Sequence, residues 1–127
     1  MRDVTEAVGQ FRDAWNRHDA DALAALWAED GELNHPWGFR AVGREAIRML
    51  LEDEHRGPMA ASELTISRIE SRASERSAIA EIDGVLAHVR APNGREYDLD
   101  HKLSAMFEAA DGAWKLRTLT ATPNPRR

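Results

Sequence analysis

The chain has 127 residues, the usual length of a single domain, and a formal net charge of −5 from 17 basic and 22 acidic side chains. It contains no cysteine, which excludes a disulfide framework, a cysteine-based zinc site and a thiol nucleophile. We find no basic stripe, no signal-peptide core and no apolar run of membrane-spanning length, so we expect a cytoplasmic protein that binds neither nucleic acid nor membrane.

Helical patterns fill the first half of the chain. The predicted elements are, in order, a helix over 3–17, a helix over 19–28, an extended piece over 32–35, a loop over 37–42 and a helix over 44–55. The first helix is predicted from one apolar stripe, made of Val4, Val8, Phe11 and Trp15. Asp19 is the candidate N-cap of the second helix, and Pro36 stops the extended piece.

The second half of the chain has the residue pattern of β-strands. Alternating polarity and β-branched residues predict four strands, over 62–72, 77–91, 95–109 and 113–122. Helices followed by an antiparallel meander indicate the α+β class, with one domain over 1–122 and a tail over 123–127. We expect the long sheet to be curved and wrapped around the three N-terminal helices, with a cavity at its open end.

The strand over 95–109 has one largely apolar face by its period of two. That face comprises Tyr97, Leu99, His101, Leu103, Ala105 and Phe107. It should line the interior, which places His101 and Tyr97 in or near the cavity.

The register of the preceding strand depends on the turn at Pro92-Asn93-Gly94. A three-residue loop pairs Arg90 with Glu96 and His88 with Asp98 on the outer face, and it sends Glu81 and Asp83 inward. A two-residue loop shifts the register by one and turns every side chain over, so that the inward residues are His88, Leu86 and Ile82.

Four short sequence segments resemble those of a known family. They are the segments 15–23 (WNRHDADAL), 26–31 (LWAEDG), 43–47 (GREAI) and 111–116 (DGAWKL). With the order and lengths of the elements, they make nearly the whole chain similar to the nuclear transport factor two-like superfamily, in its SnoaL-like and ketosteroid-isomerase-like branches. The resemblance implies a cone-shaped α+β barrel, a ligand pocket inside the cone, and a homodimer formed through the outer face of the sheet. It also favours the two-residue turn, whereas charge pairing favours the other.

The resemblance also implies roles for individual residues. His35, before Pro36, lies where ketosteroid isomerases carry their general base, and a histidine there can move a proton near neutral pH. Phe11 and Leu103 lie where those isomerases carry a tyrosine and a protonated aspartate, and neither can donate a hydrogen bond. Steroid-type enolisation by that mechanism is therefore not expected.

The candidate site follows from both arguments. The catalytic candidates are His35 and His101, and the candidate substrate-binding residues are Phe11, Trp15, Trp37, His88, Tyr97, Leu99 and Leu103. No cofactor and no metal are expected, because His35, His88 and His101 lack metal-binding spacing. We interpret the run 52–54, together with His18 and His55, as solvated.

Two classes of function remain open from the sequence. The first is an isomerase, cyclase or dehydratase that transfers protons on a cyclic or polyketide-like hydrophobic molecule. The second is a pocket protein without catalysis, which either binds such a ligand or serves as a dimeric interaction module.

Overall fold

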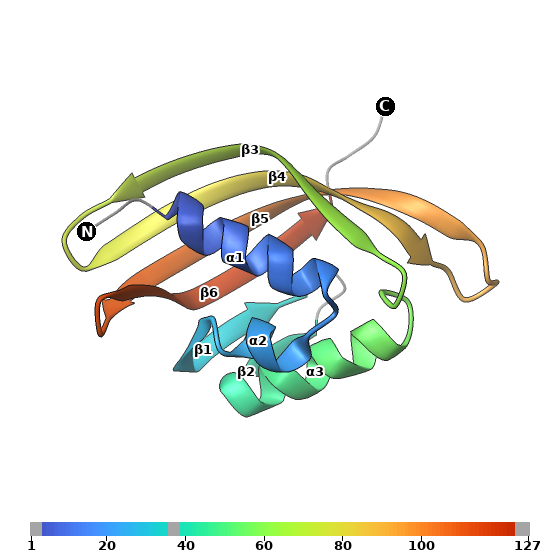
Figure 1. Cartoon of the computed structure of the whole chain (residues 1–127), viewed down its shortest axis with the longest axis horizontal. Helices are drawn as coiled ribbons and strands as arrows, with labels where there is room; N and C mark the ends of the chain where they lie inside the picture. Colours follow the sequence, from blue (N-terminus) through green and yellow to red (C-terminus); the bar gives the residue numbers. More distant parts are fainter. Residues whose placement is uncertain (1–3, 36–38, 124–127) are drawn as a thin grey trace.

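A computed structural model describes residues 4–35 and 39–123 (Figure 1). Its elements are α1 (Thr5–Asn16), α2 (Ala20–Ala24), β1 (Trp27–Asn34), β2 (Arg40–Val42), α3 (Arg44–Arg56), β3 (Glu63–Ala73), β4 (Ser77–Arg90), β5 (Glu96–Ala110) and β6 (Ala113–Pro123). The α+β class is confirmed, and the four long strands start and end within a residue or so of the predicted bounds.

The six strands form one curved sheet in the order β2-β1-β6-β5-β4-β3. The strands β2 and β3 remain at its two edges, so the sheet is open and is not a closed barrel. The four-strand meander is antiparallel as predicted, and β1 joins it by pairing with β6 in parallel.

The second helix is shorter than predicted. It ends at Ala24, and Trp27 begins a strand. The reason is a non-local hydrogen bond, since the backbone N–H of Leu116 on β6 donates to the carbonyl of Leu26 at 2.8 Å. Pairing with the sheet takes over the backbone there, and the segment 40–42, predicted as a loop, becomes the edge strand β2.

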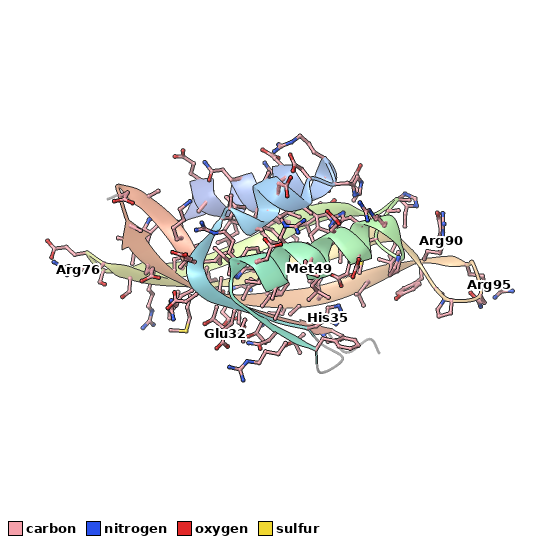
Figure 2. All side chains as sticks on the ribbon, turned by 90° about the horizontal axis from the view of Figure 1, so that it is seen from below. Glu32, His35, Met49, Arg76, Arg90 and Arg95 are labelled. Carbon is pink, nitrogen blue, oxygen red and sulfur yellow. The ribbon has the colours of Figure 1, made fainter. Side chains whose placement is uncertain are left out.

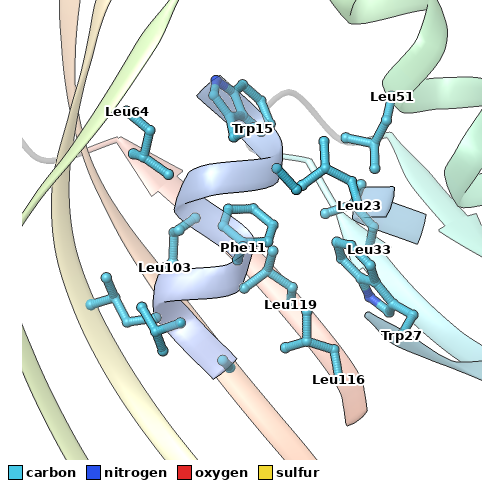
Figure 3. Packing of buried hydrophobic residues seen from close by; sticks show 14 of the residues in the cluster. Phe11, Trp15, Leu23, Trp27, Leu33, Leu51, Leu64, Leu103, Leu116 and Leu119 are labelled. Atoms are coloured by element: carbon cyan, nitrogen blue, oxygen red, sulfur yellow. The ribbon is translucent and has the colours of Figure 1, made fainter. Parts of the chain in front are cut away.

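The helices cover the concave face of the sheet, with α1 lying across the strands (Figure 1). The predicted stripe of α1 is buried, including Phe11 and Trp15. Asn16 fixes the end of the helix to β3, because its side chain donates to the carbonyl of Leu64 at 3.0 Å and accepts from the Leu64 N–H at 2.7 Å. Figure 3 shows the resulting core between α1, the other helices and the sheet.

The turn between β4 and β5 has the register of the three-residue loop, whereas the rest of β4 presents the inward face of the two-residue alternative. Arg90 pairs with Glu96, and Gly94 has a φ of 85°, as in the three-residue loop. A β-bulge between Leu86 and Val89 then shifts the register by one residue, so that Ile82 pairs with Leu103. Ile82 and Leu86 are buried, which is the face that the two-residue loop would turn inward. Figure 2 shows the hairpin tip, marked by Arg90 and Arg95, at the opposite end of the molecule from Arg76.

Candidate functional site

An apolar cavity lies between the helices and the concave face of the sheet. Its walls come from α1, α3 and five strands, and its volume is about 60 Å³ when counted as space open to the centre of a water molecule. Six of the residues predicted for the site line it, namely Phe11, Trp15, His35, Leu99, His101 and Leu103. Figure 3 shows Phe11 and Trp15 on successive turns of α1, with Leu103 beside Phe11.

A histidine–carboxylate pair stands in the cavity wall. His35 Nε2 and Glu54 Oε2 are 2.7 Å apart, and their side chains are only 10% and 14% exposed. An ionised carboxylate can only accept, so the proton of this bond is carried by Nε2. Glu54 therefore selects the tautomer of His35 in which Nδ1 is the basic nitrogen.

Local structure explains why the two side chains meet. His35 follows the last residue of β1, and its backbone N–H donates to the carbonyl of Phe39 at 2.7 Å. Figure 2 shows His35 at this end of the strand, beside α3. On α3, Ile47 and Leu51 are buried, and Glu54 continues the same face three residues further on.

Glu54 was predicted to be solvated, and the structure corrects this. The signal was present in the sequence, since the apolar positions 47 and 51 of α3 lead by helical spacing to Glu54 and His55. A carboxylate on the buried stripe of a helix requires a partner. The sequence alone does not show that the partner comes from the end of a strand.

His101 lies in the same cavity, 5% exposed. Its Nδ1 is 3.4 Å from the carbonyl oxygen of Leu99, and Gly84 is its neighbour on β4. Burial lowers the pKa of His101, against smaller opposing effects of the Leu99 and Gly84 backbone and of Asp100. The imidazole is therefore neutral at pH 7 and is oriented by backbone groups.

Two other predicted site residues, His88 and Tyr97, lie outside the cavity. His88 sits in the β-bulge with a φ of 61°, is exposed, and has its Nδ1 3.2 Å from Glu96 Oε1. The extra residue of the bulge turns it outward, which also prevents convergence with His35 and His101. Tyr97 is 39% exposed, because it lies beyond the bulge where the hairpin leaves the core. Trp37 falls outside the described residues.

A hydrogen-bond chain fixes the indole of Trp15, which forms one wall. Trp15 Nε1 donates to Ser62 Oγ at 3.0 Å, and Ser62 Oγ donates to the carbonyl of Met59 at 2.8 Å. Both Ser62 and Met59 are buried. The indole N–H is therefore engaged by a residue outside the cavity lining, and Trp15 contributes an apolar surface to the wall.

Next to Trp15 the imidazoles of His18 and His55 form a pair, although both residues were predicted to be solvated. His18 Nδ1 and His55 Nδ1 are 2.8 Å apart, and the ring centroids of His55 and Trp15 are 4.3 Å apart. His18 holds this position with a φ of 56°, where a non-glycine backbone is strained. His55 Nε2 is buried and has no hydrogen-bond partner among the described residues.

This pair predicts acid sensitivity. Burial, with a smaller contribution from the nearby His18, lowers the pKa of His55 from 6.5 to about 4. His55 therefore binds a proton near pH 6.5 in the unfolded chain and only near pH 4 in the folded protein. Because the unfolded state binds more protons between these pH values, the free energy of unfolding falls as the pH falls through this window. We expect a loss of about 2 kcal/mol between about pH 7.5 and pH 5, measured by urea denaturation.

The control is His55→Phe, which keeps an aromatic ring against Trp15 and removes the titration. Its stability should change much less with pH than that of the wild type. The buried His101 contributes the same pH dependence to both proteins, so the difference between them reports on His55. An unchanged pH profile in the variant would contradict the assignment to His55.

Within residues 4–35 and 39–123, no three histidine, aspartate or glutamate side chains are arranged to hold a metal ion. What the site presents is one neutral histidine on backbone groups, one histidine on a carboxylate, and apolar walls. This arrangement can bind a small organic molecule and exchange a proton with it.

Fold and cavity together define a small-molecule pocket domain with an open, curved sheet. The chain belongs to the SnoaL-like domain family, which it matches over residues 8–117. This family lies in the nuclear transport factor two-like superfamily, includes polyketide cyclases and isomerases, generally binds small ligands and often forms dimers.

Solved structures show the same fold at low sequence identity. An uncharacterised Caulobacter vibrioides protein with a cystatin-like fold has a TM-score of 0.87 at 18% identity, over 96% of this chain and 87% of that one. A candidate scytalone dehydratase from Novosphingobium aromaticivorans has a TM-score of 0.81 at 20% identity, over 98% and 84%. An NTF2-like protein from the same species has a TM-score of 0.81 at 22% identity, over 95% and 79%.

None of the curated proteins is detectably similar to this chain in sequence. No helix in the described part of the chain is long and apolar enough to span a membrane.

Proposed function

We propose that the chain is a proton-transfer enzyme of the isomerase, cyclase or dehydratase type, acting on a hydrophobic cyclic or polyketide-like molecule. The observation that carries this proposal is the 2.7 Å contact between His35 and Glu54 in the wall of an apolar cavity. A buried histidine held in one tautomer by a carboxylate is suited to general acid–base catalysis near neutral pH.

Each side chain has a distinct role in the proposed reaction. His35 accepts a proton from a carbon next to a carbonyl group of the substrate, which leaves an enolate and an imidazolium. Glu54 stabilises that imidazolium and keeps the ring oriented. The same proton is then returned to another atom of the substrate, which isomerises it, or to a departing hydroxyl group, which leaves as water.

His101 has a different proposed role, in binding the ligand. Its lowered pKa makes it a poor proton acceptor at pH 7, so we assign to it a hydrogen bond to the ligand. Phe11 and Leu103 line the cavity and cannot donate hydrogen bonds, so the developing oxyanion would not be stabilised by those two positions.

The test does not require the natural substrate. In heavy water, the protein should accelerate deuterium incorporation next to the carbonyl of cyclohexanone, followed by NMR. His35→Gln and Glu54→Gln should each reduce the protein-dependent rate by about 100-fold, because each removes acid–base catalysis. Asp53→Asn, an exposed neighbour on α3, is the matched control and should retain the rate. Equal rates in all four proteins would contradict the proposal.

A second candidate function is ligand binding without catalysis. It is favoured by the contact of His101 with the carbonyl oxygen of Leu99 in a cavity that is otherwise largely apolar. A protein that binds cyclic ketones tightly and shows no exchange above buffer would support it.

We also propose that the protein is a homodimer through the outer face of the sheet. Ile79 and Met106 lie directly opposite each other on β4 and β5, 52% and 53% exposed. Met106→Lys should shift the mass measured by light scattering from dimer to monomer, since a stable interface would bury ~1,200–2,000 Å² around this pair. Met49→Lys, equally exposed but on α3, should remain dimeric. A monomeric wild type at micromolar concentration would contradict this proposal.

A further inference from the structure

The charge of the cavity wall restricts the ligands it can accept. Among the described residues that line the cavity, Glu54 is the only carboxylate and there is no lysine or arginine. Its Oε2 contacts His35, whereas Oε1 has no hydrogen bond to any described residue. A ligand that enters therefore meets an acceptor oxygen and no dedicated cation.

The pair His35 and Glu54 offers an anionic ligand no net electrostatic attraction in either charge state of His35. With His35 neutral, the wall carries one negative charge in apolar surroundings, and a second anion is repelled. With His35 protonated, its charge is already balanced by Glu54 at 2.7 Å. His101 does not compensate, because burial lowers its pKa and it remains neutral at pH 7.

The depth of the cavity restricts ligand size. Beyond the main volume of about 60 Å³ lies a second apolar void of about 20 Å³. Phe11, Leu103 and Leu119 belong to the walls of both, so they form the partition between them. For comparison, an engineered apolar cavity of about 150 Å³ holds benzene. A single ring can thus be accommodated only with part of it remaining in the mouth.

We propose, on the basis of the function proposed above, that this cavity selects a neutral ligand of one ring or less carrying a hydroxyl group, which can donate to Glu54. In this arrangement Glu54 excludes anions and Phe11 sets the depth. Both are specificity-determining residues of the same site.

Three matched probes test the proposal by isothermal titration at about pH 7.5. Benzyl alcohol and benzoate share a ring and differ in charge, and 2-naphthalenemethanol keeps the alcohol and adds a ring. The wild type should bind benzyl alcohol at least about tenfold more tightly than either other probe. Glu54→Gln should bring benzoate to within about threefold of benzyl alcohol, and Asp53→Asn should not.

Phe11→Ala should join the two voids and admit 2-naphthalenemethanol, with Phe11→Leu as the milder variant if the first does not fold. Wild-type binding of benzoate or the naphthyl probe as tight as that of benzyl alcohol, or no binding of benzyl alcohol, would overturn the proposal. Because these are affinities, they are separable from deuterium exchange. Selective binding without exchange would contradict only the enzymatic function, and exchange without selectivity would contradict only this inference.

Discussion

Leu103→Asp is expected to lower the free energy of unfolding by about 4 kcal/mol or more, enough to unfold a protein of ordinary stability. Leu103 is 5% exposed and lines both the cavity and the inner void. A carboxylate there would have to be buried ionised without a cation or be protonated at neutral pH, and both are unfavourable. Denaturation by urea, followed by circular dichroism, measures the loss.

The control is Leu103→Asn, which has nearly the same shape without the charge. It should lose less stability than the aspartate variant at pH 7, and the two should converge at low pH as the carboxyl group is protonated. A melting temperature of Leu103→Asp within a degree or so of the wild type would show that this face of β5 is open to water.

Gly31→Ala is the second substitution with a large expected effect, a loss of about 3 kcal/mol. A Cβ at this position would lie 2.8 Å from Trp27 Cδ1 and 2.9 Å from the carbonyl oxygen of Leu116. Neither can move easily, because Trp27 is completely buried and Leu116 is in the core strand β6. The close approach exists because the bulge between Trp27 and Glu32 folds the indole back, where Nε1 donates to the Glu32 carbonyl at 3.0 Å.

Gly9→Ala is the matched control, with the same change in a different setting. The nearest atom to a Cβ there is the flexible end of Arg12, at 3.7 Å, and Gly9 lies within α1. This variant should gain about 0.5–1 kcal/mol, because alanine is the better helix former. Opposite signs for the two substitutions in thermal melts would support the packing at Gly31, whereas equal effects would contradict it.

The fold could be predicted where local pattern decides it. The strands β3 to β6 show alternation and turn residues along their own sequence, and α1 shows its stripe. The strands β1 and β2 could not be predicted in the same way, because β1 exists through parallel pairing with β6 at the other end of the chain. The segment from Trp27 to Gly31 looks locally like a helix end and a turn, and the distant strand overrides that preference.

The site was predictable to a similar extent. His35 and His101 were found from position and period, whereas Glu54 was hidden in an acidic run that resembles a solvated face. His88 was misplaced for a different reason. It is exposed as the three-residue turn predicts, while Leu86 and Ile82 are buried as the two-residue turn predicts, and the bulge with a left-handed histidine that joins the two is in neither alternative.

We expect the pair His35 and Glu54 to form the hydrogen bonds to the oxygen atom of a bound ligand. A crystal structure of the protein soaked with benzyl alcohol tests it most directly. We predict the ring against Phe11 and Trp15, with the hydroxyl oxygen within about 3.2 Å of the Glu54 carboxylate or the His35 ring. Benzyl alcohol bound elsewhere, or bound in the cavity with its oxygen on His101 alone, would contradict the account.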